Sequence, residues 1–314
     1  MTWLPVALSA YLFLAVANLL DKFLVDNVLK NSKAYAFVAC TLGAIIILIA
    51  PWFLKWPGAF LFFFNLFTGA IFAMALWFLY EALRRGEAAR ILVFIGGLTP
   101  IFSIAFSILF FKETYSLNKW LGMFFLLLGV LVIAFLPQER SFLTRVMNKL
   151  KLQVNLNKSG LLFALLSAFA YSSYFIATKY AYADQPFLSA FVWNRIGAAL
   201  FVMLFLFNRK DRQAISNLFK KSSPNKSKSL VIFNQALGAS GFILQNYAIF
   251  LGSVAIVNAL QGVQYAFLLV ISAILAALAP KLLKETFSWR IVFHKFAAVF
   301  IIALGLYFLT ISSS

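Results

Sequence analysis

Arg195 is the residue of this sequence that is best suited to hold a charged ligand. It lies nine residues into the apolar run 187–207, directly after Asn194. If this run crosses a bilayer as a helix, an arginine at that depth costs at least about 2.5–3.5 kcal/mol unless it faces a partner or a water-filled cavity. Two interpretations stay open. Arg195 either attracts a carboxylate or phosphate group of a ligand, or it reaches the interface or pairs with an acid from a loop.

Three polar residues of a later apolar run have the spacing of one helical face. Asn258, Gln261 and Tyr265 stand at positions i, i+3 and i+7, which predicts that they point in one direction from a single helix. Such a stripe can form the neutral hydrogen-bonding wall of a ligand cavity. It can equally make interhelical hydrogen bonds, which stabilise a bundle by about 0.6 kcal/mol each on average.

Pro100 is the one proline inside an apolar run, and Gly96 and Gly97 precede it. A helix broken at this point would free backbone groups to bind a ligand. The alternative is a proline kink whose glycines allow close helix packing, and this second interpretation is slightly favoured. Tyr174, Asn246 and Asn18 also interrupt apolar runs. They are candidates for cavity lining, although packing is the better default for each.

Two charged pairs stand at the ends of apolar runs. Glu113 follows Lys112, and Glu285 follows Lys284. Each pair could gate or bridge the mouth of a cavity. Charges at helix ends also occur with little energetic weight, and the structural role is preferred here.

The sequence lacks the groups that several other chemistries need. All nine acids lie in loops or near the ends of apolar runs, so no carboxylate is available deep in a span to bind a lipophilic cation. Neutral, zwitterionic or anionic ligands fit better. His294 is the single histidine and Cys40 the single cysteine, which excludes a Cys/His metal cluster and leaves Cys40 as a packing residue. No cofactor is expected, and a membrane-embedded enzyme is disfavoured.

The composition requires a lipid environment for the elements that carry these residues. Hydrophobic residues make up 63% of the 314 residues and charged residues 11%, against roughly 45–50% and about 25% in soluble domains. About 20 apolar residues span a bilayer as a helix. The sequence therefore predicts an all-α membrane protein with ten transmembrane helices, at 3–20, 34–54, 58–80, 88–111, 118–136, 160–180, 187–207, 230–250, 253–279 and 289–311. The first run lacks a basic region before it and is predicted to be a retained span.

Short motifs recur in order along two halves of the chain. The motif at 111–114 returns at 283–286, and the motif at 8–10 returns at 166–168. Five spans per half would invert the second copy in the membrane, with a substrate site where the halves meet. The predicted units are residues 1–136, a basic loop at 137–159, and residues 160–314.

On these features the chain resembles the drug/metabolite transporter superfamily in its ten-span EamA-type form. The residues that carry the resemblance are Glu113 and Glu285 after the fourth span of each half, Pro100, and the stretch 80–88. The resemblance implies a secondary transporter that exports or exchanges small metabolites such as amino acids, sugars, nucleotide derivatives or drugs. Ala266 stands roughly where Pro100 stands in the first half, so the sequence gives no reason for unwinding there.

A secondary transporter working by alternating access is therefore the leading hypothesis. A flippase for a lipid-linked metabolite is the alternative, and a channel is disfavoured because no filter-like motif occurs. The expected partners are a small-molecule substrate, a bilayer with anionic lipids, and a proton or counter-substrate for coupling. Nucleic acid is excluded because the basic residues occupy short loops. Both a monomer and a homodimer are compatible with the sequence.

The basic residues predict the orientation in a cell membrane. Most of the 27 Lys and Arg fall in alternate loops, including 22–33, 137–159 and 208–229. The positive-inside rule makes these loops cytoplasmic and puts both termini outside. Members of the family usually have both termini in the cytoplasm, so the two criteria disagree.

Overall fold

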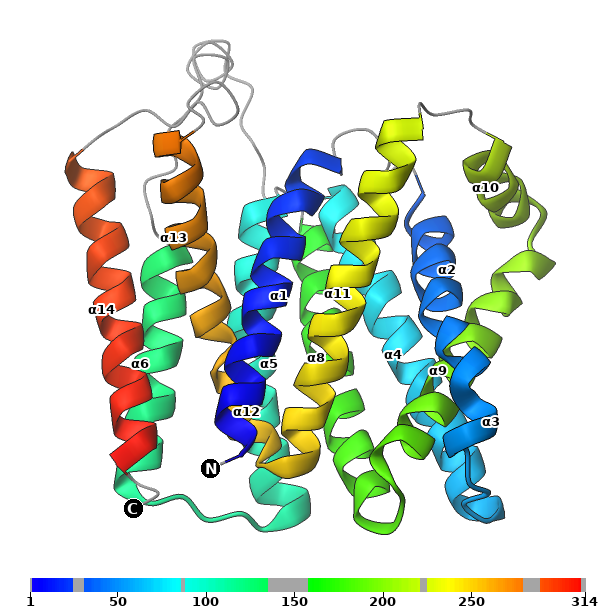
Figure 1. The fold of residues 1–314 in the computed structure, drawn as a ribbon, viewed down its shortest axis with the longest axis horizontal. Helices are drawn as coiled ribbons and strands as arrows, with labels where there is room; N and C mark the ends of the chain where they lie inside the picture. Colours follow the sequence, from blue (N-terminus) through cyan, green and yellow to red (C-terminus); the bar gives the residue numbers. More distant parts are fainter. Residues whose placement is uncertain are drawn as a thin grey trace.

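The chain folds as a bundle of helices (Figure 1). A computed structural model describes residues 2–24, 31–85, 88–134, 158–220, 225–278 and 289–311. Glu285, Lys284 and nearly all of the predicted basic loop 137–159 lie outside these residues, and so does the side chain of Asn18. The elements are α1 (Trp3–Leu24), α2 (Ser32–Gly43), the 3-10 helix η2 (Ala44–Ile49), α3 (Ala50–Phe53), α4 (Ala59–Arg85), α5 (Ala88–Phe111), α6 (Leu117–Ala134), α8 (Lys158–Asp184), α9 (Phe187–Met203), the 3-10 helix η3 (Leu204–Phe207), α10 (Arg209–Lys220), α11 (Asn225–Leu251), α12 (Val254–Ala259), α13 (Gln261–Leu278) and α14 (Trp289–Ile311).

The outer surface of the bundle is suited to lipid. Four helical segments are long and apolar enough to cross a membrane, at Ala59–Arg85, Phe94–Phe111, Ser159–Asp184 and Phe187–Phe207, and shorter apolar helices accompany them. Phe60, Phe63 and Phe67 of α4 are all largely exposed. Rings in such a row would be unfavourable in water but are solvated by acyl chains. The predicted all-α membrane class is therefore confirmed, whereas the number of crossings stays a prediction.

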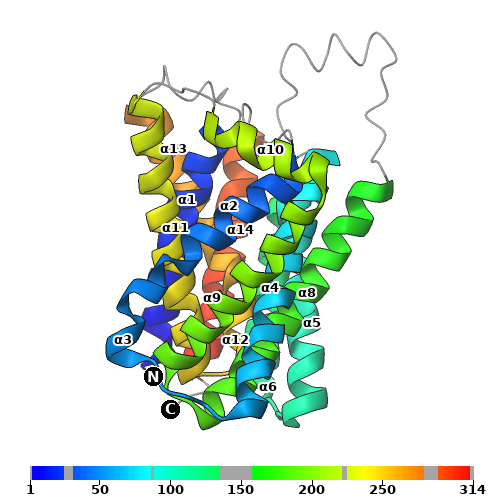
Figure 2. The same ribbon diagram turned by 90° about the vertical axis from the view of Figure 1, so that its right-hand side faces the viewer.

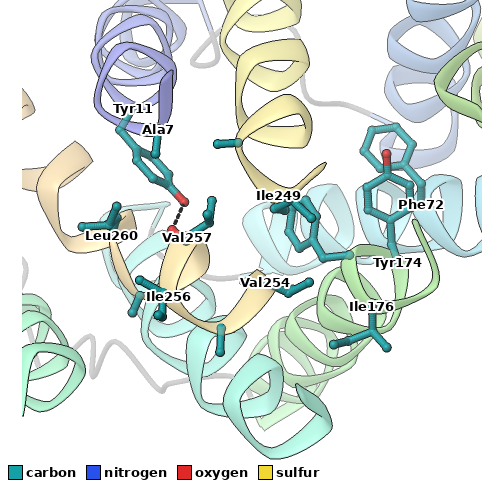
Figure 3. Close-up of a cluster of buried hydrophobic side chains, with 14 of the residues drawn as sticks. Ala7, Tyr11, Phe72, Tyr174, Ile176, Ile249, Val254, Ile256, Val257 and Leu260 are labelled. Atoms are coloured by element: carbon teal, nitrogen blue, oxygen red, sulfur yellow. Dashed lines mark hydrogen bonds between the residues drawn. The ribbon is translucent and has the colours of Figure 1, made fainter. Parts of the chain in front are cut away.

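Helices from the first and the second half of the sequence pack against each other. α1 packs against α11, α4 against α8 and α9, α5 against α8 and α12, and α6 against α14. Both termini lie at one end of the bundle, and α10 lies at the opposite end (Figures 1 and 2). A single large core cluster joins side chains of several of these helices, among them Tyr11, Phe72, Tyr174 and Val254 (Figure 3).

Two predictions about continuity were wrong. The run predicted as one span at 253–279 is divided at Leu260 into α12 and α13. The region 208–229, predicted as a loop, contains α10 and the start of α11. By contrast, α5 continues through Pro100 as one helix, so of the two interpretations offered for that segment the unbroken helix is the one observed.

Candidate functional site

Arg195 is buried in a box of aromatic rings. Its side chain belongs to α9, and only 6% of the residue is exposed. The guanidinium carbon lies 4.0 Å from the ring centroid of Phe72 on α4, 4.7 Å from that of Phe191 on α9, and 4.8 Å from that of Phe242 on α11. Aromatic faces attract a cation, by about 2 kcal/mol where water is excluded. The box therefore offsets part of the cost of burying this charge.

A short chain of hydrogen bonds orients the guanidinium. Nη2 of Arg195 donates to the Tyr174 hydroxyl at 2.9 Å, and that hydroxyl donates to Oδ1 of Asn246 at 3.0 Å. Tyr182 donates to the same oxygen at 3.3 Å, while Nδ2 of Asn246 is held by the main-chain oxygen of Phe242 at 2.9 Å. Because Asn246 is anchored to its own helix, it fixes the direction in which the Tyr174 hydroxyl accepts from Arg195.

The hydrogen-bonding capacity of this site is not fully used. Nε of Arg195 is buried without a hydrogen-bond partner, and so are both side-chain polar atoms of the neighbouring Asn194. The ion pairs among the described residues involve other cations, namely Lys33, Arg84 and Arg85. A buried cation without an anion is costly. Among the described residues, Arg195 is therefore a buried cation with one unused donor and no ion-pair partner.

The break between α12 and α13 is stabilised by a tyrosine from α1. The hydroxyl of Tyr11 donates to the main-chain oxygen of Val257 at 2.6 Å (Figure 3). At the break the N–H of Leu260 is shared between the main-chain oxygens of Ile256 at 3.1 Å and Val257 at 3.2 Å, and the N–H of Val263 donates to Leu260 at 2.8 Å in the tighter i to i−3 pattern. The Tyr11 hydroxyl thus gives the Val257 oxygen a second donor at the point where the regular helix is interrupted.

Asn258 lies beside this break in a polar network that links several helices. Its Nδ2 donates to Ser103 of α5 at 2.8 Å, and its Oδ1 accepts from Gln245 of α11 at 3.4 Å. Gln245 also donates to Tyr11 at 3.3 Å, and Ser103 donates to Ser172 of α8 at 3.3 Å. The network is neutral, so it can hold the polar, uncharged part of a ligand or simply join the helices.

The single continuous helix predicted for Asn258, Gln261 and Tyr265 is interrupted in the structure, whereas their common direction stays a prediction. The break places Asn258 on α12 and the other two residues on α13. The Tyr265 hydroxyl donates to the main-chain oxygen of Leu92 on α5 at 2.9 Å, and Gln261 is half-buried. A Cβ atom on Gly96 would lie 2.1 Å from the Tyr265 hydroxyl, which gives this glycine a packing role next to the buried Pro100.

Glu113 ties two connections together at the end of the bundle that holds the termini. Its Oε2 accepts from the Tyr115 hydroxyl at 2.5 Å and from Oγ of Ser253 at 2.5 Å. Ser253 is the residue before α12. Burial and the Glu113 carboxylate raise the pKa of Tyr115 to about 12, so Tyr115 stays a donor throughout the physiological range. Lys112 is exposed and has a positive φ of 52°.

Lys179 of α8 holds the other side of the same turn. Its Nζ donates to the main-chain oxygens of Ile249, Phe250 and Gly252, at 2.9, 3.0 and 2.8 Å. These are carbonyls at the C-terminal end of α11, where a cation is favourable. The turn between α11 and α12 is thus fixed from two sides.

Lys179 was not among the predicted site residues, although the sequence contained a signal for it. Lys179 is the single charge in the apolar stretch 161–183, which singles it out in the same way as Arg195. Phe72 and Phe242 carried no such signal, because they are two among 38 phenylalanines. Ser253 gave no signal either, since its role depends on Glu113 from the other half of the sequence.

An all-helical bundle with a largely apolar outer surface is the architecture of a membrane protein with several spanning helices. The family model described as the EamA-like transporter family matches residues 1–135 and 158–311. The chain belongs to this family.

Two individual proteins are also similar to this chain. The protein named "Uncharacterized transporter YdfC" from Bacillus subtilis (strain 168) is 36% identical over 110 residues, which are 34% of this chain and 30% of that protein. The alignment thus spans about a third of the curated relative. A solved crystal structure superposes with a TM-score of 0.63 over 99% of this chain and 98% of that chain, at 15% identity, and this likeness concerns the fold alone.

Proposed function

We propose that this transporter is a secondary transporter that exports small neutral, zwitterionic or anionic metabolites, such as amino acids, by alternating access. The observation that carries the proposal is Arg195, which is buried among aromatic rings with Nε unpaired. A carboxylate or phosphate group on a substrate would supply the missing anion. Asn194 and the neutral network around Asn258 would then contact the polar remainder of the substrate.

The proposed architecture has ten spans in two inverted halves, residues 1–136 and 160–314. The separate matches of the family model to 1–135 and 158–311 support it. So does the helix packing, because α1 on α11 and α8 on α4 are the same contact with the halves exchanged. Arg195 comes from the second half and Phe72 from the first, and their contact supports a site where the halves meet.

The proposed location is the cell membrane, with the basic end in the cytoplasm and the termini outside. The supporting feature is α10, whose basic residues lie at the end of the bundle opposite both termini (Figure 1). The transport cycle would be coupled to a counter-substrate or a proton.

A metabolite screen on proteoliposomes tests this function. Purified protein would be reconstituted, and uptake of anionic, zwitterionic, neutral and cationic metabolites would be compared with uptake into protein-free vesicles. We expect net or exchange uptake in the zwitterionic or anionic classes. Uptake confined to organic cations would contradict the proposal.

The hydrogen bonds of Glu113 to Tyr115 and Ser253, called the latch below, are proposed to hold the turn before α12 closed at the end of the bundle where the termini lie. Replacing Glu113 with glutamine weakens two hydrogen bonds to a charged acceptor, each worth about 1.5–3 kcal/mol. We therefore expect the turn before α12 to open about tenfold more often. The measurement is the rate at which a thiol reagent modifies a Ser107→Cys reporter in a Cys40→Ala background, since Ser107 is fully buried next to the latch.

The matched control for this latch is Lys112→Asn on the same loop, because asparagine tolerates a positive φ. The control should leave the Ser107→Cys reporter as slow to react as in the native chain. Equal rates in Glu113→Gln and Lys112→Asn would show that the Glu113 contact does not control opening.

A further inference from the structure

The helix α10 differs in orientation from the apolar helices of the bundle. It lies across the end of the bundle opposite the termini, whereas its neighbours run along the bundle (Figures 1 and 2). It follows η3 directly and packs against α2 and η3. A helix that lies across the end of a membrane bundle, outside the apolar runs, is expected at the depth where lipid headgroups meet water.

The two sides of α10 have different chemistry. Ile215 and Asp211 are buried against the bundle, while Arg209, Lys210 and Arg212 are exposed. The first turn of this helix therefore presents three cations outward. Its single acid points the other way.

An ion pair removes the one negative charge of α10 from this surface. Asp211 pairs with Nζ of Lys33 on α2 at 2.8 Å. Lys33 also lies 5.3 Å from the ring of Trp77 and 5.5 Å from the ring of Phe205. Since Lys33 compensates Asp211, the charge of the three exposed cations is left for an external anion.

Apolar side chains border these cations. Phe207, two residues before Arg209, is 86% exposed, and Leu204 and Met203 of the same segment are exposed as well. An exposed phenylalanine next to exposed arginines matches the boundary between acyl chains and phosphates, because lipid tails cover the ring and headgroups pair with the cations. A soluble anion would satisfy the cations only.

We propose that Arg209, Lys210 and Arg212 form a binding site for the phosphate groups of anionic phospholipids, positioned by the Lys33–Asp211 ion pair. The occupant is the lipid headgroup, since the exposed apolar residues beside the cations need the acyl chains of the same leaflet. Anionic lipid then holds α10 against α2.

Amide hydrogen exchange in lipid nanodiscs tests this site in the intact protein. Native protein would be compared in discs of phosphatidylcholine and in discs of phosphatidylcholine mixed with phosphatidylglycerol. We expect the amides of 209–216 to exchange about tenfold more slowly in the anionic discs, because each basic residue gains from the anionic surface. Inorganic phosphate added to phosphatidylcholine discs should have no such effect.

Two triple variants complete the test. Arg209→Gln with Lys210→Gln and Arg212→Gln should abolish the difference between the two kinds of disc. Lys55→Gln with Lys112→Asn and Lys119→Gln removes as many cations from the opposite end and should preserve it. The proposed lipid site would be overturned if α10 of the native protein exchanged equally in both kinds of disc. It would also be overturned if both triple variants lost the difference between the discs equally, or if inorganic phosphate alone protected the amides.

Discussion

Replacing Arg195 with glutamine abolishes uptake of an anionic or zwitterionic substrate and leaves the protein folded in the membrane. Glutamine keeps a polar amide of similar chain length to the Nε position but removes the charge. Depriving a buried anion of its cation costs about 3–5 kcal/mol, which is at least a hundredfold in affinity at tenfold per 1.4 kcal/mol. The measurement is the initial uptake rate in proteoliposomes, with the substrate found by the metabolite screen.

Two variants separate the charge of Arg195 from its shape. Arg195→Lys keeps the charge but loses the planar fork that Tyr174 and the aromatic rings orient, so we expect intermediate uptake. Lys55→Gln removes an exposed cation and should transport like the native chain. Native uptake of an anion by Arg195→Gln would show that this arginine only supports the bundle.

Replacing Gly69 with alanine is expected to prevent normal packing of α9, the helix that carries Arg195. A Cβ atom on Gly69 would lie 2.0 Å from the main-chain oxygen of Asn194 and 2.6 Å from the main-chain nitrogen of Ala198. The reverse contact is equally tight, since a Cβ on Gly197 would lie 2.3 Å from the oxygen of Leu66. Small residues at helix crossings in membranes allow this approach.

We expect Gly69→Ala to lower the free energy of unfolding by at least the roughly 1–3 kcal/mol that is typical of overpacking. The loss is this large because the added methyl group would meet backbone atoms, which cannot rotate away as a side chain can. The measurement is the melting temperature of the purified protein in detergent. Gly238→Ala on α11 is the matched control, since its nearest neighbour would be the Ala17 Cβ at 3.8 Å, an ordinary contact. Equal melting temperatures for the two variants would contradict the close α4–α9 packing.

The helices could be predicted because each apolar run carries its own evidence. Runs such as 187–207 are long enough to cross a bilayer and end at charges or proline, which are local properties. The depth of Arg195 was local as well. Of the aromatic box around it only Phe191 was local, because it precedes Arg195 by four residues on the same helix. Phe72 and Phe242 come from two other helices, whose arrangement is a tertiary property.

The break at Leu260 shows the limit of local reasoning most clearly. The surrounding sequence has no proline, and the hydroxyl that bonds Val257 comes from Tyr11, 246 residues away. The helix α10 was missed for another reason. Its charged composition favoured a loop, although Asp211, Ala214 and Ile215 have the i, i+3, i+4 spacing of a helix face that packs inward.

The proposed mechanism depends most on two halves that cross the bilayer in opposite directions, because two inverted halves can exchange conformations and so open the site between them to either side in turn. Thr114 and Thr286 occupy equivalent positions in the repeated motif. Each would be changed to cysteine in a Cys40→Ala background and treated with a membrane-impermeant thiol reagent on intact cells. If the halves are inverted, one cysteine is labelled directly and the other only after permeabilisation. Labelling of both from the same face would contradict the inversion.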